Sequence, residues 1–422
     1  MAFAAASAIV GLEEAQPIST RAQPLPHRLH MRRRTVVLAG VVLLLAAAGI
    51  AVAVDPFQSS QRTETARPGL QRLVDGLVEG PSKIAPGATA YVSGPHGTWL
   101  GAAGVADTET GAAMRPDARM RLESVSKIYT ATLIVQLAEE RRLRLDDTVA
   151  HWLPGLFPDG NRITIRELLT MQSGLIDNND IRNASATEQR AIVARVKDAR
   201  LRAKLVAIAA RVQKDPATEV APIWWVRFAA WQPLVSTPGF GYHYSNIGYD
   251  VLGLIAARAG GEPLARLYRD RIFEPLGLHA TAYDPQGPIE GQHARGYGIQ
   301  PNGSLIDTTT WHYGVGADGG IVSNATDVAR FLRALMRGEL VDRRQVVAME
   351  NESLWLGGAS SGCAGSAYGW SGGGEGYKTE VWVSDGGERV AVLLLNARHL
   401  GTGQPGGDEA AARARTTLYC GA

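Results

Sequence analysis

Strand-forming segments lie at both ends of the region 69–422, and a long segment with helical periodicity separates them. Near the amino end, residues 89–93 and 99–105 predict a hairpin around a Gly-Pro-His-Gly turn. Near the carboxyl end, residues 378–384 and 389–396 predict a second hairpin around Asp-Gly-Gly. Neither hairpin can bury its apolar face alone, so we expect one antiparallel sheet made from both ends of the chain.

Helices are expected between the two hairpins and on the faces of the sheet. The inserted segments with helical apolar spacing are 128–143, 164–170, 186–212, 247–259 and 263–273, and the others are 69–79, 328–335 and 408–418. Asn324 and Asp327 form a capping pair before one of them. We therefore predict an α+β fold, in which an antiparallel sheet flanked by helices carries an inserted all-helical domain at about 130–315. The cleft between these two parts is the expected site.

The amino-terminal residues predict a membrane segment. Residues 1–34 are basic, and residues 35–54 are almost all apolar, which is enough to cross about 30 Å of hydrocarbon as a helix. The basic flank predicts a cytoplasmic amino terminus, with 55–68 as a linker and 69–422 outside the cell. The alternative is a signal peptide cleaved after Ala53, which would make the protein secreted rather than anchored in the cell membrane.

The composition excludes several kinds of partner. The chain of 422 residues is 45% hydrophobic with a formal net charge of +2, and its basic residues are scattered, so no nucleic acid partner is expected. The nine histidines form no metal-spaced cluster, so no metal is expected. Residues 314–319 match a dinucleotide fingerprint in letters only, without the strand–turn–helix unit that it needs. No cofactor is therefore expected.

Two cysteines, Cys363 and Cys420, lie in the region expected outside the cell, where a disulfide is allowed. A bridge between them would attach the carboxy-terminal helix to the segment around residue 363 and would contribute about 2–4 kcal/mol. Two free buried thiols are the alternative.

A serine and a lysine three residues apart open the helix predicted at 128–143. Ser124 and Lys127 would share one helical face, so the lysine amine can reach the serine hydroxyl. A serine is a weak nucleophile until such a neighbour activates it. Ser126 points to another face. A Ser-x-x-Lys quartet also occurs by chance, so it needs support from elsewhere in the chain.

Two further motifs offer that support. Tyr244 and Asn246 alternate in a turn after Pro238-Gly239, so both can project into one cleft, where a phenol can relay a proton and a carboxamide can bind an amide. The alternative is a helix cap by Ser245 or Asn246, with Tyr244 in the core. Residues 370–376 (WSGGGEG) are glycine-rich, and glycines allow a backbone to approach a ligand closely.

Other polar and aromatic residues of the insert are given no catalytic role. His243 is expected to be packed or solvent-facing. Trp224, Trp225 and Trp231 either line the rim of the cleft or fill the core, and the core is favoured.

These motifs, in this order, resemble the serine β-lactamase and D-alanyl-D-alanine carboxypeptidase superfamily, in particular its class C-like branch with related esterases. The resemblance covers about residues 69–420. The segments that carry it are 121–127 (RLESVSK), 168–175 (LLTMQSGL), 238–239 with 244–249 (YSNIGY), 272–278 (IFEPLGL) and 319–323 (GGIVS).

The resemblance implies a role for each site residue. Ser124 is the acylated nucleophile, Lys127 activates it, and Tyr244 relays the proton. Asn246 binds the acyl-side amide of the substrate. Trp370, Ser371 and Gly372 align with the third motif, and the backbone N–H groups of Ser124 and Gly373 form the oxyanion hole.

The third motif departs from the family pattern. The family usually has Lys-Thr-Gly or His-x-Gly there, and Trp370 cannot supply the cation that would lie near a substrate carboxylate. Residues 378–380 (KTE) are a rival third motif that we reject, because Glu380 puts a side chain where the family needs bare backbone.

We therefore expect an exported serine hydrolase that acts through an acyl-serine intermediate. A D-alanyl-D-alanine carboxypeptidase-like activity on cell-wall peptides fits the expected location best. A class C-like β-lactamase is the nearest alternative, and an esterase, which needs no carboxylate anchor, is the third. A non-catalytic protein that binds cell-wall peptide is the alternative from another class.

Overall fold

The computed structural model describes residues 67–422, apart from 81–82, 216, 219, 286, 312–314, 352–356, 360–362, 364–365 and 401–404. The predicted basic segment 1–34, the predicted membrane segment 35–54 and the linker before residue 67 lie outside the described residues. Within the described residues, no helix combines the length and the apolar composition that a membrane crossing needs.

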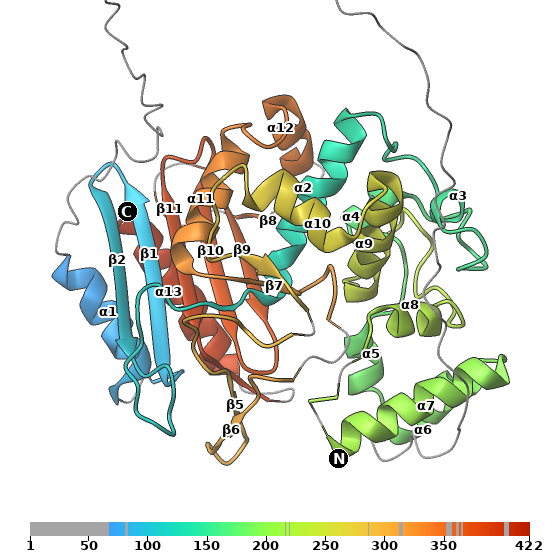
Figure 1. Cartoon of the computed structure of the whole chain (residues 1–422), viewed down its shortest axis with the longest axis horizontal. Coiled ribbons are helices and arrows are strands. Elements are labelled where there is room, and N and C mark those ends of the chain that lie inside the picture. The colour runs from blue at the N-terminus through green and yellow to red at the C-terminus, as the bar shows by residue number, and fades with distance from the viewer. Residues whose placement is uncertain are drawn as a thin grey trace, which may run out of the picture. The chain divides into compact units, whose positions relative to one another are not determined.

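A six-stranded antiparallel sheet in the order β2-β1-β11-β10-β9-β8 organises the folded unit (Figure 1). Its strands are β1 (Gly87–Gly94), β2 (Gly97–Gly104), β8 (Gly357–Ala359), β9 (Ala367–Gly373), β10 (Lys378–Ser384) and β11 (Val390–Leu395). Strand β1 pairs with β11, so the hairpins from the two ends of the chain meet inside the sheet. The predicted sheet is confirmed.

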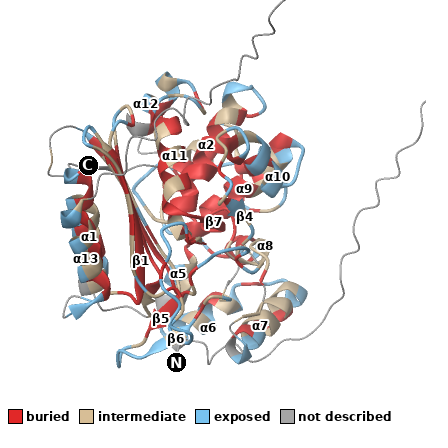
Figure 2. Ribbon diagram, turned by 60° about the vertical axis from the view of Figure 1, so that its left-hand side comes forward, coloured by how far each residue is buried: buried red, intermediate tan, exposed pale blue. Residues whose placement is uncertain are grey.

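The sheet is covered on both faces, which explains why β11 is apolar throughout. Helices α1 (Pro68–Val78) and α13 (Pro405–Cys420) pack on one face, and α11 (Ala325–Met336) packs on the other (Figure 2). Alternate β11 residues enter two separate cores, because successive strand side chains point to opposite faces. Ala391, Leu393 and Leu395 join the core of α1 and α13, and Val390, Val392 and Leu394 join the core of α11.

The helical insert follows the first hairpin. Its helices are α2 (Ser126–Glu139), α3 (Val149–Trp152), α4 (Ile165–Leu169), α5 (Asn178–Asn183), α6 (Ala186–Ala194), α7 (Ala199–Lys214), α8 (Ile223–Ala229), α9 (Asn246–Gly260) and α10 (Leu264–Tyr268), with a further π-helical turn at Arg269–Phe273. Helix α2 is mostly apolar, and its residues 126–135 and 137 are buried, with the apolar ones in the larger core, as expected of a buried helix. It carries the lysine of the first motif.

The helical part ends at Phe273, earlier than the predicted limit near 315. Short strands follow instead, namely β4 (Ala282–Tyr283), β5 (Tyr297–Ile299) and β6 (Leu305–Asp307). Strands β5 and β6 form a hairpin whose turn contains Gly303 at φ 81°, a left-handed conformation that glycine adopts without strain. This turn chemistry favours the hairpin over a longer helix.

The remaining short strands connect the insert to the sheet region. They are β3 (Met120–Arg121), β7 (Ile321–Ser323) and β12 (Ala397–His399). Strand β7 pairs with β3, immediately before Ser124, and also with β4. The predicted cap is present beyond β7, where the Asp327 N–H donates to Asn324 Oδ1 at 2.9 Å before α11.

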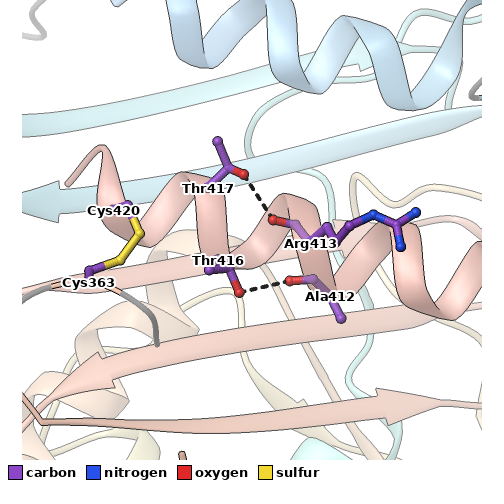
Figure 3. The surroundings of a disulfide bond; sticks show 6 residues. All are labelled: Cys363, Ala412, Arg413, Thr416, Thr417 and Cys420. Carbon is purple, nitrogen blue, oxygen red and sulfur yellow. Dashed lines mark hydrogen bonds between the residues drawn. A yellow bond between two sulfur atoms is a disulfide. The ribbon is translucent and has the colours of Figure 1, made fainter. Parts of the chain in front are cut away.

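The carboxy-terminal helix α13 ends beside the segment that contains Cys363 (Figure 3). The Cα atoms of Cys363 and Cys420 lie 5.6 Å apart, which is within the range that a disulfide spans. The bridge itself remains a prediction, which mass spectrometry of unreduced peptides would test.

Candidate active site

Ser124 lies in a single 3-10 turn, Glu123–Val125, directly before α2 begins at Ser126. Glu123 has φ 53°, a left-handed conformation that is uncommon for a residue with a side chain. The three-residue spacing still brings the Lys127 Nζ atom to 3.2 Å from Ser124 Oγ. Ser126 points elsewhere, because its Oγ accepts a hydrogen bond from the Ile321 N–H at 3.1 Å.

Lys127 is completely buried, and its ammonium group donates three hydrogen bonds. The acceptors are Ser124 Oγ at 3.2 Å, Asn246 Oδ1 at 2.6 Å and the Asp318 backbone oxygen at 2.8 Å. Burial alone would lower the pKa of Lys127, but the nearby Tyr244 and Asp318 outweigh burial and raise it. The lysine is therefore charged at neutral pH.

The second motif combines the two alternatives that the sequence allowed. Ser245 caps α9, since its Oγ accepts from the Gly248 N–H at 3.1 Å. Tyr244 nevertheless projects toward Ser124, with its hydroxyl 2.8 Å from Ser124 Oγ. The Lys127 Nζ atom lies 5.1 Å from the centre of the Tyr244 ring. Ser124, Lys127 and Tyr244 therefore form one connected hydrogen-bonded group.

Asn246 is held in place from both ends of its amide. Its Oδ1 accepts from Lys127, and its Nδ2 donates to Asn178 Oδ1 at 3.0 Å. Its backbone N–H donates to Asp177 Oδ1 at 2.7 Å. In this arrangement Asn246 orients Lys127, and its substrate-binding role remains a prediction.

Asp177 is a residue that sequence reasoning missed. It is buried, it caps α5 in a box with Asp180, and burial raises its pKa above the usual aspartate value. The Asp-x-x-Asp pattern of a capping box, two residues after the family-like segment 168–175, was the available signal.

Sequence reasoning also missed two aspartates near Lys127, namely Asp250 and Asp318. The Asp318 backbone oxygen holds the lysine, and its Oδ1 accepts from the Gly316 N–H at 2.8 Å. Asp250, on α9, is buried, and burial together with the neighbouring Asp318 carboxylate raises its pKa well above the usual value. This shift favours the protonated form of Asp250, which disfavours two adjacent buried negative charges. No local pattern pointed to this pair.

The third motif lies on β9, whose backbone runs beside Ser124. A Cβ atom at Gly372 would lie 2.4 Å from the Leu122 backbone oxygen and 3.1 Å from the Ser124 nitrogen, so only glycine fits there. Trp370 faces the same side, and its Nε1–H donates to the Ser124 backbone oxygen at 3.1 Å. The rejected rival, residues 378–380, lies on the neighbouring strand β10.

Positions 371 and 373 face the opposite side of β9, because successive residues of a strand point to opposite faces. The Ser371 hydroxyl donates to Glu380 Oε1 at 2.7 Å and accepts from Lys378 Nζ at 2.8 Å. A Cβ atom at Gly373 would meet the Arg398 guanidinium, 2.8 Å from its Nε. The structure thus brings Trp370 and Gly372 to Ser124, but it turns the Ser371 side chain away from Ser124.

His243 and Trp231, for which the sequence indicated no catalytic role, lie outside this group. His243 Nε2 lies 2.9 Å from Asp180 Oδ2, and its ring is directed at that carboxylate rather than at Ser124. Trp231 is 36% exposed, which differs from the expected core position because it follows the last turn of α8.

A buried lysine and a tyrosine that both contact one serine hydroxyl, with a strand backbone beside the serine nitrogen, define a serine hydrolase. The family model described as Beta-lactamase matches residues 70–416. The chain belongs to the beta-lactamase family.

Three proteins illustrate this relationship. Esterase EstB of Burkholderia gladioli is 33% identical over 221 residues, which are 47% of this chain and 47% of that protein. Penicillin-binding protein 4 of Amycolatopsis lactamdurans is 28% identical over 267 residues, 60% of each chain. The crystal structure of a D-stereospecific amidohydrolase from Streptomyces sp. superposes with a TM-score of 0.64 at 25% identity, covering 84% of this chain and 98% of that one. The matches to the first curated relatives span about half to two thirds of those proteins' length.

Proposed function

We propose that the protein hydrolyses carboxylic esters through an acyl intermediate on Ser124. The observation that carries this choice is the position of Trp370. Its indole stands where the family usually presents a cation to a substrate carboxylate, and its N–H is already bonded to the Ser124 backbone oxygen. Esters need no carboxylate anchor, and the similarity to an esterase supports the same choice.

Two cations lie beside the third motif, and both have carboxylate partners. Lys378 Nζ is 3.1 Å from Asp408 Oδ1, and the Arg398 guanidinium is 3.5 Å from Asp408 Oδ2. Both belong to the face of β9 that carries α13. Each cation is therefore already paired with a carboxylate, which weakens the case for a terminal carboxylate on the substrate.

The reaction begins when Ser124 Oγ attacks the ester carbonyl carbon. The serine proton passes to the Tyr244 oxygen, which acts as the general base in its phenolate form, while the Lys127 ammonium stays protonated and stabilises that negative charge. The backbone N–H groups of Ser124 and Gly373 stabilise the tetrahedral oxyanion, at about 3 kcal/mol for each donor. Its collapse breaks the bond to the alcohol, which takes the proton from Tyr244. Water then repeats these steps on the acyl-serine and releases the acid.

A D-alanyl-D-alanine carboxypeptidase on cell-wall peptides is the second candidate. The similarity to penicillin-binding protein 4 of Amycolatopsis lactamdurans favours it. This candidate also agrees with the export that residues 35–54 predict. We propose a membrane-anchored or secreted protein on that ground alone, and fractionation of cells followed by amino-terminal sequencing would test it.

The deciding experiment compares substrates on the full chain. We expect hydrolysis of p-nitrophenyl acetate, a transient acetyl adduct on Ser124 by intact mass, and neither in Ser124→Ala with an unchanged circular dichroism spectrum. Faster release of D-alanine from a D-alanyl-D-alanine peptide would transfer the assignment to the carboxypeptidase. A stable penicillin adduct with slow turnover would point the same way, and rapid penicillin turnover would indicate a β-lactamase. Undiminished activity in Ser124→Ala would overturn the acyl-serine mechanism itself.

A further inference from the structure

Large apolar side chains are exposed in one short segment beside the second motif. Among the described residues, six large hydrophobic side chains are exposed, and four of these lie within 231–242. Phe240 is 73% exposed and Tyr242 69%, the two highest values in this set. The others are Trp231, Val235, Leu305 and Val347. A concentration of this kind indicates a surface that binds an apolar partner.

The segment is held rigidly at its base. The backbone N–H groups of Val235, Gly239 and His243 donate to the backbone oxygens of residues 174, 172 and 171, at 2.8, 3.0 and 2.8 Å. Gly239 and Gly241 both have φ 80°, so the chain makes a tight tip that carries Phe240 between them. The exposed rings are therefore presented by an anchored turn.

The tip continues directly into the catalytic group. The N–H groups of His243 and Ser245 both donate to Met171, to its backbone oxygen at 2.8 Å and to its sulfur at 3.4 Å, and Ser245 has extended dihedral angles. This alternation is that of an extended chain, in which side chains two apart point to the same side. Tyr242 therefore shares the side of Tyr244, whose hydroxyl is 2.8 Å from Ser124 Oγ. Partial burial raises the pKa of Tyr242, Tyr244 raises it further, and Lys127 opposes them, which agrees with a hydroxyl close to the catalytic pair.

We propose that Phe240 and Tyr242 form an aromatic lip that binds the apolar alcohol group of an ester substrate. The proposal rests on the proposed esterase function. It names the alcohol because Tyr244 hands its proton to the leaving oxygen, so the leaving alcohol lies on the side of Tyr244 and of the lip. An apolar alkyl or aryl alcohol covers the two rings and removes apolar surface from water on both partners.

The test varies the alcohol while the acyl group stays constant. The full chain is assayed by proton release with ethyl acetate and with hexyl acetate, and kcat/KM is measured for each. We expect the wild type to prefer hexyl acetate. In Phe240→Ala the ratio of hexyl to ethyl kcat/KM should fall about tenfold, the order of magnitude expected when a few methylene groups lose partial burial. Phe240→Leu, which restores apolar surface, should recover most of the ratio.

A matched control and a second substrate series make the result specific. Val347→Ala removes an exposed apolar side chain from α12 (Arg343–Asn351), outside the lip. It should leave kcat/KM unchanged for both ethyl acetate and hexyl acetate. p-Nitrophenyl acetate and octanoate keep the alcohol constant, so their ratio should not respond to Phe240→Ala. A response in this acyl series alone would overturn the assignment to the alcohol side.

Other occupants of the lip would give different results. An unchanged hexyl-to-ethyl ratio with weaker co-sedimentation on phosphatidylglycerol vesicles would identify a lipid surface, and a lower dimer fraction in sedimentation would identify a second copy of the chain. Either result overturns the proposal, as does an equal fall in Val347→Ala. Wild-type protein that hydrolyses no ester would instead refute the proposed function, so the two failures are distinguishable.

Discussion

Two buried lysines on opposite sides of β9 show how the same side chain serves two purposes. Lys127 donates only to neutral oxygen atoms, those of Ser124, Asn246 and the Asp318 backbone. Lys378 instead contacts two carboxylates, Glu380 at 3.2 Å and Asp408 at 3.1 Å. A buried charge without a carboxylate in contact is costly, and such groups concentrate at reactive centres.

The cluster around Lys378 extends from the face of the sheet to α13. Glu380, which is 1% exposed, also lies 2.7 Å from the Arg415 guanidinium, and Arg415 stacks on Trp382 at 4.6 Å. Each buried charge there has an opposite charge in contact. We infer that this cluster attaches α13 to the sheet, whereas Lys127 serves the chemistry. The comparison predicts opposite effects of the two lysines on activity and on stability.

The largest effect is expected from Lys127→Met. Loss of the ammonium removes the group that we propose activates Ser124, so kcat/KM for p-nitrophenyl acetate should fall about 10³-fold. Methionine fills a similar volume without a buried charge, so the free energy of unfolding should stay constant or rise. Steady-state kinetics and urea denaturation measure the two quantities. Activity within tenfold of the wild type would remove Lys127 from the mechanism.

The matched change on the other side of the strand is Lys378→Met. It leaves Glu380 and Asp408 short of a positive partner, so the free energy of unfolding should fall by about 3 kcal/mol. Activity of the folded fraction should change less than tenfold. The comparison fails if this variant is as stable as the wild type, or if it is as inactive as Lys127→Met.

Glu123 is influenced by charges from both sides of β9, and its pKa gives a prediction about how stability depends on pH. Burial raises the pKa of Glu123 to about 7, while Arg121 and Arg398 oppose the rise and Glu375 and Asp318 add to it. The folded state then keeps a proton that the unfolded state loses near pH 4.5. Stability should therefore decrease as the pH rises from about 4.5 to 7, by up to about 3 kcal/mol.

Glu123→Gln isolates this contribution because glutamine cannot ionise. Urea unfolding at pH 5 and pH 8 should show a decrease for the wild type that is larger than the decrease for the variant. Equal decreases in the two proteins would mean that Glu123 titrates normally in the folded state.

The smallest effect is expected from Ser371→Ala. The Ser371 hydroxyl bonds to Glu380 and Lys378, so its removal should cost about 1 kcal/mol of unfolding free energy and change kcat/KM less than threefold. A large rise in KM with unchanged stability would instead support the role in substrate binding that the resemblance implies.

The sequence alone determined the features that depend on local spacing. The turn sequences between strand-forming terminal segments predicted the two hairpins, and the need to cover the apolar faces of both predicted one sheet. The three-residue spacing of Ser124 and Lys127 predicted their contact, because helical geometry fixes the direction of both side chains within one turn. The cap before α11 was predictable for the same reason.

Only the tertiary structure decided which distant groups complete the site. Asp177 and Asp318 reach Asn246 and Lys127 from parts of the chain 69 and 191 residues away, and no local period encodes such contacts. The register of β9 against β10 decided that Trp370 faces Ser124 while Ser371 faces Lys378. The motif itself could be found in the sequence. Successive side chains of a strand point to opposite faces, so the packing of the sheet decided which of these residues face Ser124.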